Sequence, residues 1–428
     1  MRRLPALLFA LAVGSACAAD IEVLHWWTSP GEVRALQELR QRVNAAGYRW
    51  NDFSVIGGGG ENALNVLRTR AKLDNLPTAA AVGGAQVREW GRLGLLGDVS
   101  VTARAQDWPN VLPAELDAMI KIGPRYVAVP LGVARINMMW SNAAALRRVG
   151  ATPPQSWAEF FPIAEKLRRA GIVPLAVGQQ NWQLATLLEA VVLAEAGPER
   201  YREIFVTPVP GAGRDPRFIH ALSVFKRLKP FTDMPNMHRG RDWSQIAAEV
   251  IHGHAAMTVL GDWAKGEFSA AGKQAGRDYL CTAAPGSASA FSFDTDLLVM
   301  FNPSATAPQQ QAQQDLARIA MSKETQEAFN FYKGNIPARA DVTLERYDEC
   351  ARLSARAFAD SSRRNTLVPS WAHNMALSDA ARTAVFGVVG RFWRSPAMTA
   401  EQAARQIEAA IATTDTPQRA AAPLERRG

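Results

Sequence analysis

Hydrophobic and polar positions along the chain follow two alternating periods, which predict a succession of strands and helices. Short apolar runs such as 21–25 and 255–260 are typical of buried strands, whereas longer segments repeat apolar residues every three or four positions. One such repeat predicts a helix that begins near Pro30: Val33, Leu36, Leu39 and Val43. Because strands and helices alternate, we expect an α/β protein with mostly parallel sheets covered by helices.

The first 19 residues have the pattern of a secretory signal peptide. Two arginines precede an apolar run over 4–13, and small residues over 14–19 allow cleavage after Ala18 or Ala19. A lipoprotein modified at Cys17 is the alternative, disfavoured because Gly14 stands where leucine is usual. No later stretch approaches the roughly 20 apolar residues of a membrane span. We therefore expect a soluble protein exported to the periplasm.

Composition narrows the possible functions further. The net charge of +8 falls to about +6 without the two arginines of the leader, and basic residues are scattered among acidic ones, which argues against a nucleic-acid-binding surface. Cys281 and Cys350 form an even pair in an oxidising compartment, so we expect a disulfide. His252-Gly253-His254 is too short and isolated for a metal site. We expect no metal and no cofactor.

Tryptophans stand beside hydrogen-bonding side chains where three expected strands end. Trp26, Trp27 and Glu32 follow the strand over 21–25, and Trp182 and Trp263 follow two others. In open α/β sheets ligands bind beyond the carboxyl ends of strands. Indoles offer flat apolar faces, and a carboxylate accepts hydroxyl hydrogens, so this edge is suited to a sugar.

Each of these residues also has a purely structural interpretation. Ser29, Pro30 and Glu32 fit a capping box with proline at the first helical position, so Glu32 either caps the helix, contacts a ligand, or does both. Core packing is the ordinary role of tryptophan. We expect it for five of them: Trp50, Trp90, Trp108, Trp157 and Trp393.

Several segments together resemble one protein family. They are Trp26-Trp27-Thr28-Ser29-Pro30-Gly31-Glu32, the glycine-rich segment 57–70, Glu89-Trp90-Gly91, Gly240-Arg241-Asp242-Trp243, the segment 257–268 with Gly261-Asp262-Trp263, Lys333-Gly334-Asn335-Ile336-Pro337, and His373. With these segments, nearly the whole mature chain resembles the periplasmic sugar-binding proteins of bacterial ABC importers, in particular the glucose-binding branch.

The resemblance implies a two-lobed periplasmic binding protein fold with hinge crossings between the lobes. One lobe is expected to hold 20–130 plus about 262–325, the other 131–261 plus about 326–412, with a frayed tail over 413–428. A sugar in the cleft would contact seven residues: Trp26, Trp27, Glu32, Trp263, Asp294, Lys333 and His373. The implied role is a monomeric, non-enzymatic carrier that delivers a mono- or oligosaccharide to a membrane permease, with a chemoreceptor as a further candidate partner.

Six positions depart from the polar or aromatic pattern of close glucose binders: Gly83, Gly132, Ala134, Met138, Val177 and Leu184. Such losses predict weaker glucose binding, and space for a larger or differently substituted carbohydrate. Two other functions stay open. One is a glycoside-active enzyme that uses two of Glu32, Asp262, Asp294 and Asp296; the other is a periplasmic adaptor without a ligand.

Overall fold

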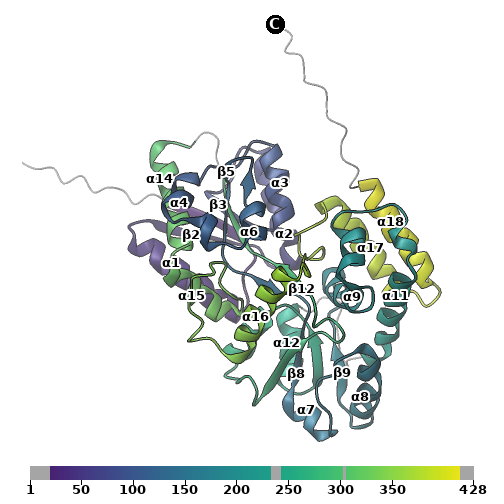
Figure 1. The fold of residues 1–428 in the computed structure, drawn as a ribbon. Helices are drawn as coiled ribbons and strands as arrows, with labels where there is room; N and C mark the ends of the chain where they lie inside the picture. The colour runs from purple at the N-terminus through teal and green to yellow at the C-terminus, as the bar shows by residue number, and fades with distance from the viewer. Residues whose placement is uncertain (1–19, 233–241, 302–304, 415–428) are drawn as a thin grey trace, which may run out of the picture.

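Two hydrophobic cores, each built around its own sheet, divide the chain into two lobes (Figure 1). A computed structural model describes residues 20–232, 242–301 and 305–414. The expected signal peptide over 1–19 lies outside these residues, as does most of the expected tail. Within them, no helix combines the length and the apolar character needed to cross a membrane.

The first lobe contains a five-stranded sheet in the order β2-β1-β3-β13-β6. Its strands are β1 (Asp20–His25), β2 (Arg49–Ser54), β3 (Ala79–Val82), β6 (Ala128–Pro130) and β13 (Leu297–Met300), with the small hairpin β4 (Lys121–Ile122) and β5 (Arg125–Tyr126) nearby. Its helices are α1 (Pro30–Ala45), η1 (Gly58–Gly60), α2 (Glu61–Lys72), α3 (Gly84–Arg92), α4 (Ser100–Ala105), α5 (Trp108–Val111), α6 (Ala114–Met119), α14 (Ala307–Ala320) and α15 (Lys323–Lys333).

The second lobe contains a four-stranded sheet in the order β11-β8-β10-β9. Its strands are β8 (Met138–Asn142), β9 (Val173–Ala176), β10 (Ala255–Val259) and β11 (Tyr279–Ala283). Its helices are α7 (Ala143–Arg148), α8 (Trp157–Arg169), α9 (Asn181–Glu195), α10 (Gly197–Phe205), η2 (Ala212–Arg214), α11 (Pro216–Leu228), η3 (Lys229–Phe231), α12 (Trp243–Ile251), α13 (Ala264–Ala270), α17 (Asp379–Arg394) and α18 (Ala400–Thr414).

A third, three-stranded sheet joins the lobes. It has the order β14-β12-β7, with β7 at Ala134–Arg135, β12 at Phe291–Asp294 and β14 at Leu367–Pro369. Beside each strand the chain leaves one core for the other, at 133/134, 290/291 and 367/368. Three crossings, as expected from the resemblance, therefore form the hinge. The helix α16 (Glu349–Arg363) packs behind this sheet through Phe358, which meets Phe291 and Phe293 edge-on.

The lobe boundaries differ from the expected ones in the second half of the chain. Residues 262–283 were expected in the first lobe, but α13 contributes to the second core and β11 pairs with β8 in the second sheet. Residues 326–358 were expected in the second lobe, but most of their buried apolar residues, including Phe329 and Phe358, belong to the first core. The expected boundaries were wrong because the crossings occur at the hinge strands, which the hydrophobic pattern does not distinguish from other strands.

Local sequence explains where α1 begins. The hydroxyl of Ser29 accepts a hydrogen bond from the backbone N–H of Glu32, and the Glu32 carboxylate accepts one from the N–H of Ser29, which completes the capping box. Proline occupies the first turn, where its missing N–H costs nothing. The five tryptophans expected in cores, between Trp50 and Trp393, are all buried. The expected disulfide between Cys281 on β11 and Cys350 on α16 is present.

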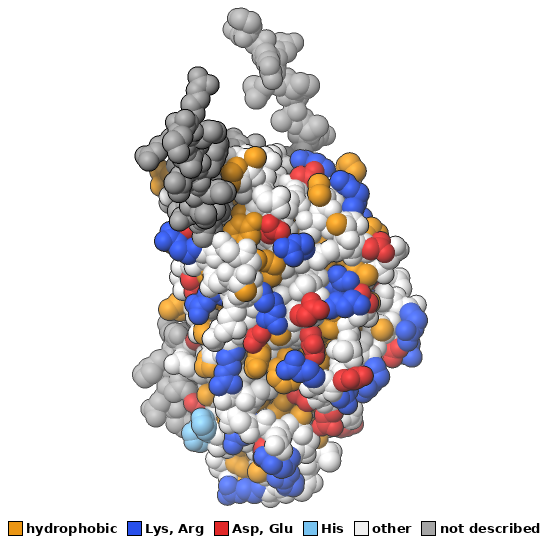
Figure 2. Space-filling view, turned by 90° about the vertical axis from the view of Figure 1, so that its left-hand side faces the viewer, with side chains coloured by type: hydrophobic (Ala, Val, Ile, Leu, Met, Phe, Trp, Pro, Cys, Tyr) orange, Lys and Arg blue, Asp and Glu red, His pale blue; other side chains and the backbone are white. Residues whose placement is uncertain are grey.

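The surface carries both signs of charge. In Figure 2 the basic and acidic side chains of one face lie intermixed and do not form a stripe of one sign. This agrees with the scattered charge of the sequence.

A buried carboxylate on α9 ties the second lobe to the hinge. Glu189 accepts hydrogen bonds from the hydroxyl of Ser292 on β12, from Ser370 Oγ at 2.9 Å and from the N–H of Ala372 at 3.1 Å. Its side chain has no solvent exposure. Burial raises the pKa of Glu189 to about 7, against the hydrogen bonds that favour the charged form.

We expect Glu189→Gln to change how stability depends on pH. Because the folded-state pKa lies above that of the unfolded chain, the unfolded state loses its proton first as pH rises from about 4.5 to about 7. The wild-type protein should therefore lose free energy of unfolding over this interval, on the order of 2–3 kcal/mol, and the neutral variant should not lose this part.

Urea unfolding at pH 5 and pH 8 measures the effect. The variant should gain stability relative to wild type on going to pH 8, while the surface substitution Glu165→Gln on α8 should not. A wild-type-to-variant difference that is the same at both pH values would refute the assignment.

Candidate ligand-binding cleft

A cavity between the lobes collects most of the residues singled out from the sequence. Its volume is about 60 Å³, room for only a few water molecules, so the lobes stand close together. The lining residues come from both lobes and the hinge: Trp26, Glu32, Gly59, Val82, Gly83, Trp182, Trp243, Trp263, Asp294, Thr295, Asp296, Lys333, His373 and Asn374. Six of the seven expected ligand contacts thus border one space.

Four indoles line this cavity. Trp26 comes from the first lobe and lies against the backbone of Gly60 in the turn before α2. Trp182, Trp243 and Trp263 come from the second lobe, and Trp263 lies with its ring centroid 6.3 Å from that of Trp243. Aromatic faces therefore meet the cavity from both sides.

Trp27 lies elsewhere, in the first core. It is 1% exposed, stacks on His25 with ring centroids 5.2 Å apart and meets Phe329 edge-on. The ammonium of Lys333 lies 5.3 Å from the centroid of its indole. Adjacent residues on an extended chain point in opposite directions, so only Trp26 of the pair lines the cavity. Trp27 supports Lys333 from the side of the core, and we do not propose it as a ligand contact.

A buried charge cluster forms the floor of the cavity. Lys333 Nζ lies 3.2 Å from Glu32 Oε1 and 3.1 Å from Asp296 Oδ2, and all three side chains are at least 90% buried. Burial lowers the pKa of Lys333, but Asp296 and Glu32 together raise it above its ordinary value. Glu32 Oε2 meanwhile accepts the N–H groups of Thr28 and Ser29. Glu32 therefore caps α1, as one of the sequence interpretations expected, and also holds Lys333.

Two further titratable side chains reach the cavity, and burial favours the neutral form of each. Burial, followed by the nearby Asp296, raises the pKa of Asp294 well above its ordinary value. Burial also lowers the pKa of His373 to about 3. The Nε2 atom of His373 lies 2.9 Å from Thr186 Oγ1, and its ring centroid lies 5.0 Å from that of Trp263. A protonated carboxyl and a neutral imidazole each offer both a donor and an acceptor.

Five polar or aromatic residues of the cavity were not among the seven expected contacts: Trp182, Trp243, Thr295, Asp296 and Asn374. Trp182 and Trp243 did carry a signal, since one follows a strand and the other belongs to a segment of the family resemblance. Asp296, two residues after Asp294, was considered only for catalysis. Asn374 carried no local signal, because it reaches the cavity through a loop that crosses from the other lobe.

The positions that depart from the glucose binders do not open space in the cleft. A Cβ placed on Gly83 would lie 2.5 Å from the Cβ of Asn374, and one placed on Gly132 would lie 1.8 Å from Asn330 Oδ1. The other four, Ala134, Met138, Val177 and Leu184, are buried in the second core. Only Gly83 lines the cavity. At Gly83 and Gly132, the space that the missing side chains would leave is thus filled by Asn374 and Asn330.

The carboxylates considered for glycoside chemistry do not all lie in the cavity. Asp262 does not line the cavity; it accepts hydrogen bonds from Ser354 Oγ at 2.6 Å and from the N–H of Arg135 at 3.0 Å. Glu32 and Asp296 are paired with Lys333. Across the described residues, no group of three or more histidine, cysteine or acidic side chains could hold a metal ion.

Comparison with known proteins identifies a family that the chain matches. Residues 43–352 match the family model of bacterial extracellular solute-binding proteins. A probable sugar-binding periplasmic protein of Brucella suis biovar 1 (strain 1330) is 36% identical over 408 residues, covering 94% of this chain and 96% of the relative. One of the same description from Rhizobium meliloti (strain 1021) is 36% identical over 406 residues, covering 95% and 97%.

Solved structures agree in fold. A chitin oligosaccharide binding protein aligns with a TM-score of 0.77 at 16% identity over 92% of this chain and 98% of its own. The bacterial solute receptor AcbH, described as having an exclusive preference for β-D-galactopyranose, aligns with a TM-score of 0.77 at 16% identity over 93% and 99%. By its sequence match and its two-lobed fold, this chain belongs to the bacterial extracellular solute-binding protein family.

Proposed function

We propose that this protein is the substrate-binding component of an ABC-type sugar importer, which captures a carbohydrate between its lobes and presents it to a membrane permease. The observation that carries the proposal is the interlobe cavity, where indoles of both lobes surround one cluster of hydrogen-bonding groups. The names of the relatives, which describe periplasmic sugar-binding proteins, support it.

The chemistry of the cavity suits a neutral polyol. A sugar ring presents apolar C–H faces that pack on indoles, here Trp26 and Trp263, and hydroxyl groups that donate and accept hydrogen bonds. Lys333 donates only, whereas Asp294 and His373 in their neutral forms do both. The single positive charge of Lys333 already faces two carboxylates, Glu32 and Asp296, so the cluster does not require an anionic ligand.

Ligand binding would act on the permease through the position of the lobes. Gly31 N–H donates to Glu267 Oε1 at 2.9 Å, and Ala85 N–H donates to the carbonyl of Asn374 at 2.7 Å, each across the two lobes. A sugar must enter while these contacts are open, and because the cavity seen here holds only a few water molecules, the lobes would close less far around a bound sugar than they do in this structure. A permease that binds the closed form more tightly than the open form then senses occupancy.

A non-enzymatic carrier accounts for the carboxylates better than a hydrolase does. Glycoside hydrolysis needs one protonated carboxyl and one free carboxylate on opposite sides of the scissile bond. The raised pKa of Asp294 favours the protonated form that the first role needs, but Glu32 and Asp296 are held by the same lysine on the floor of the cavity. Both relatives are described as binding proteins, which supports the same conclusion.

A thermal-shift screen of mono- and disaccharides tests the proposal. A sugar that binds only the folded protein should raise the free energy of unfolding by about 2.7 kcal/mol at a hundredfold excess over its dissociation constant. No shift with any sugar would favour the adaptor without a ligand. New reducing ends after incubation with a glycan panel would favour the enzyme.

Trp263→Ala should weaken binding of the sugar found in that screen by tenfold or more. The indole contributes apolar contact, and aromatic stacking adds about 0.5–1.5 kcal/mol beyond burial. Calorimetry measures the affinity, and a thermal melt checks that the fold persists. Trp50→Phe, in the first core away from the cavity, is the control and should leave the affinity unchanged. Equal affinities for both variants would remove Trp263 from the site.

A further inference from the structure

A second cavity lies behind the hinge, between β11 of the second sheet and α16. Its volume is about 370 Å³, within the range of small-molecule sites. The lining residues come from β7, β11, the loop before β12, and α16 with the residue that follows it: Arg135, Cys281, Thr282, Ala283, Ala288, Ser289, Leu353, Arg356, Ala357, Asp360, Ser361 and Arg364. Three arginines and one acidic residue give this wall an excess of positive charge.

This cavity and the sugar cleft lie on opposite faces of the hinge sheet. Asp294 on β12 pairs with Ala134 on β7, and Phe293 pairs with Arg135. Paired residues share a face and successive residues alternate. Asp294 lines the cleft, so Arg135 points to the other side, where it packs over the ring of Phe291. The second cavity is therefore not part of the cleft.

Arg135 is a buried cation without a carboxylate partner. It is 2% exposed; its Nε donates to Asn137 Oδ1 at 3.2 Å and its Nη2 to the carbonyl of Ala290 at 2.9 Å. Within the described chain, no carboxylate oxygen lies within 4 Å of its guanidinium, and its other N–H groups have no protein acceptor. Burial lowers the pKa of Arg135 to about 10, and the charge of Asp262, which accepts the backbone N–H of Arg135, only partly offsets this. A buried charge is costly unless it is paired, and an anion in the cavity would pair directly with the guanidinium.

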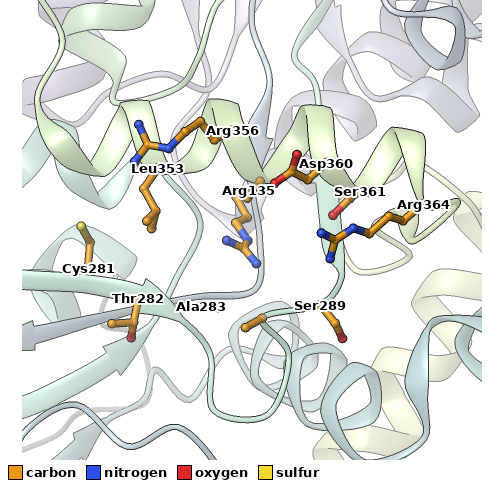
Figure 3. A pocket seen from close by; sticks show the side chains of 12 residues that line it. Arg135, Cys281, Thr282, Ala283, Ser289, Leu353, Arg356, Asp360, Ser361 and Arg364 are labelled. Atoms are coloured by element: carbon orange, nitrogen blue, oxygen red, sulfur yellow. The ribbon is translucent and has the colours of Figure 1, made fainter.

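Arg364 and Arg356 border the same space from the other side. In the described part of the chain neither forms a side-chain ion pair, since the only acidic lining residue, Asp360, pairs with Arg363 outside the cavity. Figure 3 shows the guanidinium groups of Arg135 and Arg364 directed toward the space above Ser289, with Ser361 beside Arg364. Leu353 and Ala357 add an apolar wall on the same helix.

We propose that this cavity binds a small organic oxyanion, with its carboxylate or phosphate group between Arg135 and Arg364 and its apolar part against Leu353 and Ala357. A guanidinium presents N–H groups in a planar fork that matches a carboxylate or phosphate. Because β11 and α16 belong to different sides of the hinge, such an anion bridges elements that the crossings connect. The inference is independent of the identity of the sugar.

Titration calorimetry with three probes tests the proposal: inorganic phosphate, phenyl phosphate and citrate, each at constant ionic strength set with sodium chloride. Phenyl phosphate should bind to one saturable site, and more tightly than inorganic phosphate because of the apolar wall, whereas citrate tests a carboxylate in place of the phosphate. No saturable binding of either organic anion would overturn the proposal. Phenyl phosphate that binds no more tightly than inorganic phosphate would overturn the assignment of the apolar wall.

Two exposed arginines of the same region give a matched pair of variants. Arg364→Gln should weaken organic-anion binding about tenfold or more, since it removes charge-assisted hydrogen bonds. Arg352→Gln removes the same charge from a position on α16 that does not line the cavity, and should change the affinity less than twofold. Equal effects would mean attraction by general charge only and would overturn the site. Trp263→Ala, in the sugar cleft, should leave anion affinity unchanged; a loss there would place the anion in the cleft.

Discussion

Lys333→Met is expected to lower the free energy of unfolding by about 3–5 kcal/mol and to abolish carbohydrate binding. The substitution leaves Glu32 and Asp296 buried without a cation, and breaking a buried ion pair by removing one partner is costly for this reason. The cleft would also lose the one lysine among its described lining residues, which is the group that fixes its two acidic neighbours. Urea unfolding at pH 7 measures the first effect and calorimetry the second.

The same helix provides the control. Lys323, at the start of α15, also pairs with an aspartate, Asp341 at 3.0 Å, but is largely exposed. Lys323→Met should therefore cost no more than about 1 kcal/mol and leave sugar affinity unchanged. A loss as small as that of the control would show that the cluster is solvated in solution.

Removing the disulfide is the second large expected effect. The double variant Cys281→Ala, Cys350→Ala should lose about 4 kcal/mol of unfolding free energy, because the bridge closes a loop with a sequence separation of 69 and restricts the unfolded chain. The bridge also ties β11 to α16 across the back of the hinge. Chemical denaturation of the oxidised wild type and of the variant measures the difference.

Reduction separates the bridge from other effects of the two substitutions. A thiol reductant should destabilise the wild type to about the level of the double variant and have no effect on the variant itself. Thiol titration of the unfolded, unreduced mature chain should find neither Cys281 nor Cys350 free. Two free thiols, or a wild type indifferent to reductant, would contradict the prediction.

The cleft, the charge cluster and the hinge together explain how a ligand could couple the two lobes. The charge cluster belongs to α1, the hinge and the end of α15, whereas three of the four cavity indoles belong to the second lobe. A ligand that touches both groups favours the closed arrangement of the lobes. The network around Glu189 joins α9 to β12 and to the chain after β14, so it fixes the second lobe on the strands about which closure would occur.

Local sequence determined the features that depend on neighbouring residues. The capping box at Ser29 and Glu32, the alternation of helices and strands, and the parity of Cys281 and Cys350 were all predicted correctly because each follows from short-range chemistry or from counting. The family resemblance also named seven residues, six of which line one cavity in the structure.

Only the tertiary structure decided which parts of the chain meet across the hinge. The sequence does not distinguish Trp26 from Trp27. In the structure Trp26 lines the cavity and Trp27 fills the core, because successive side chains at the end of the strand point in opposite directions. From the sequence, Gly83 and Gly132 suggest empty space where relatives have larger side chains. In the structure Asn374 and Asn330, about 200 or more residues away in the chain, pack against them. The lobe boundaries after residue 262 depend on which strand β11 pairs with. Long-range packing is a property of the whole chain, and local patterns of residues do not encode it.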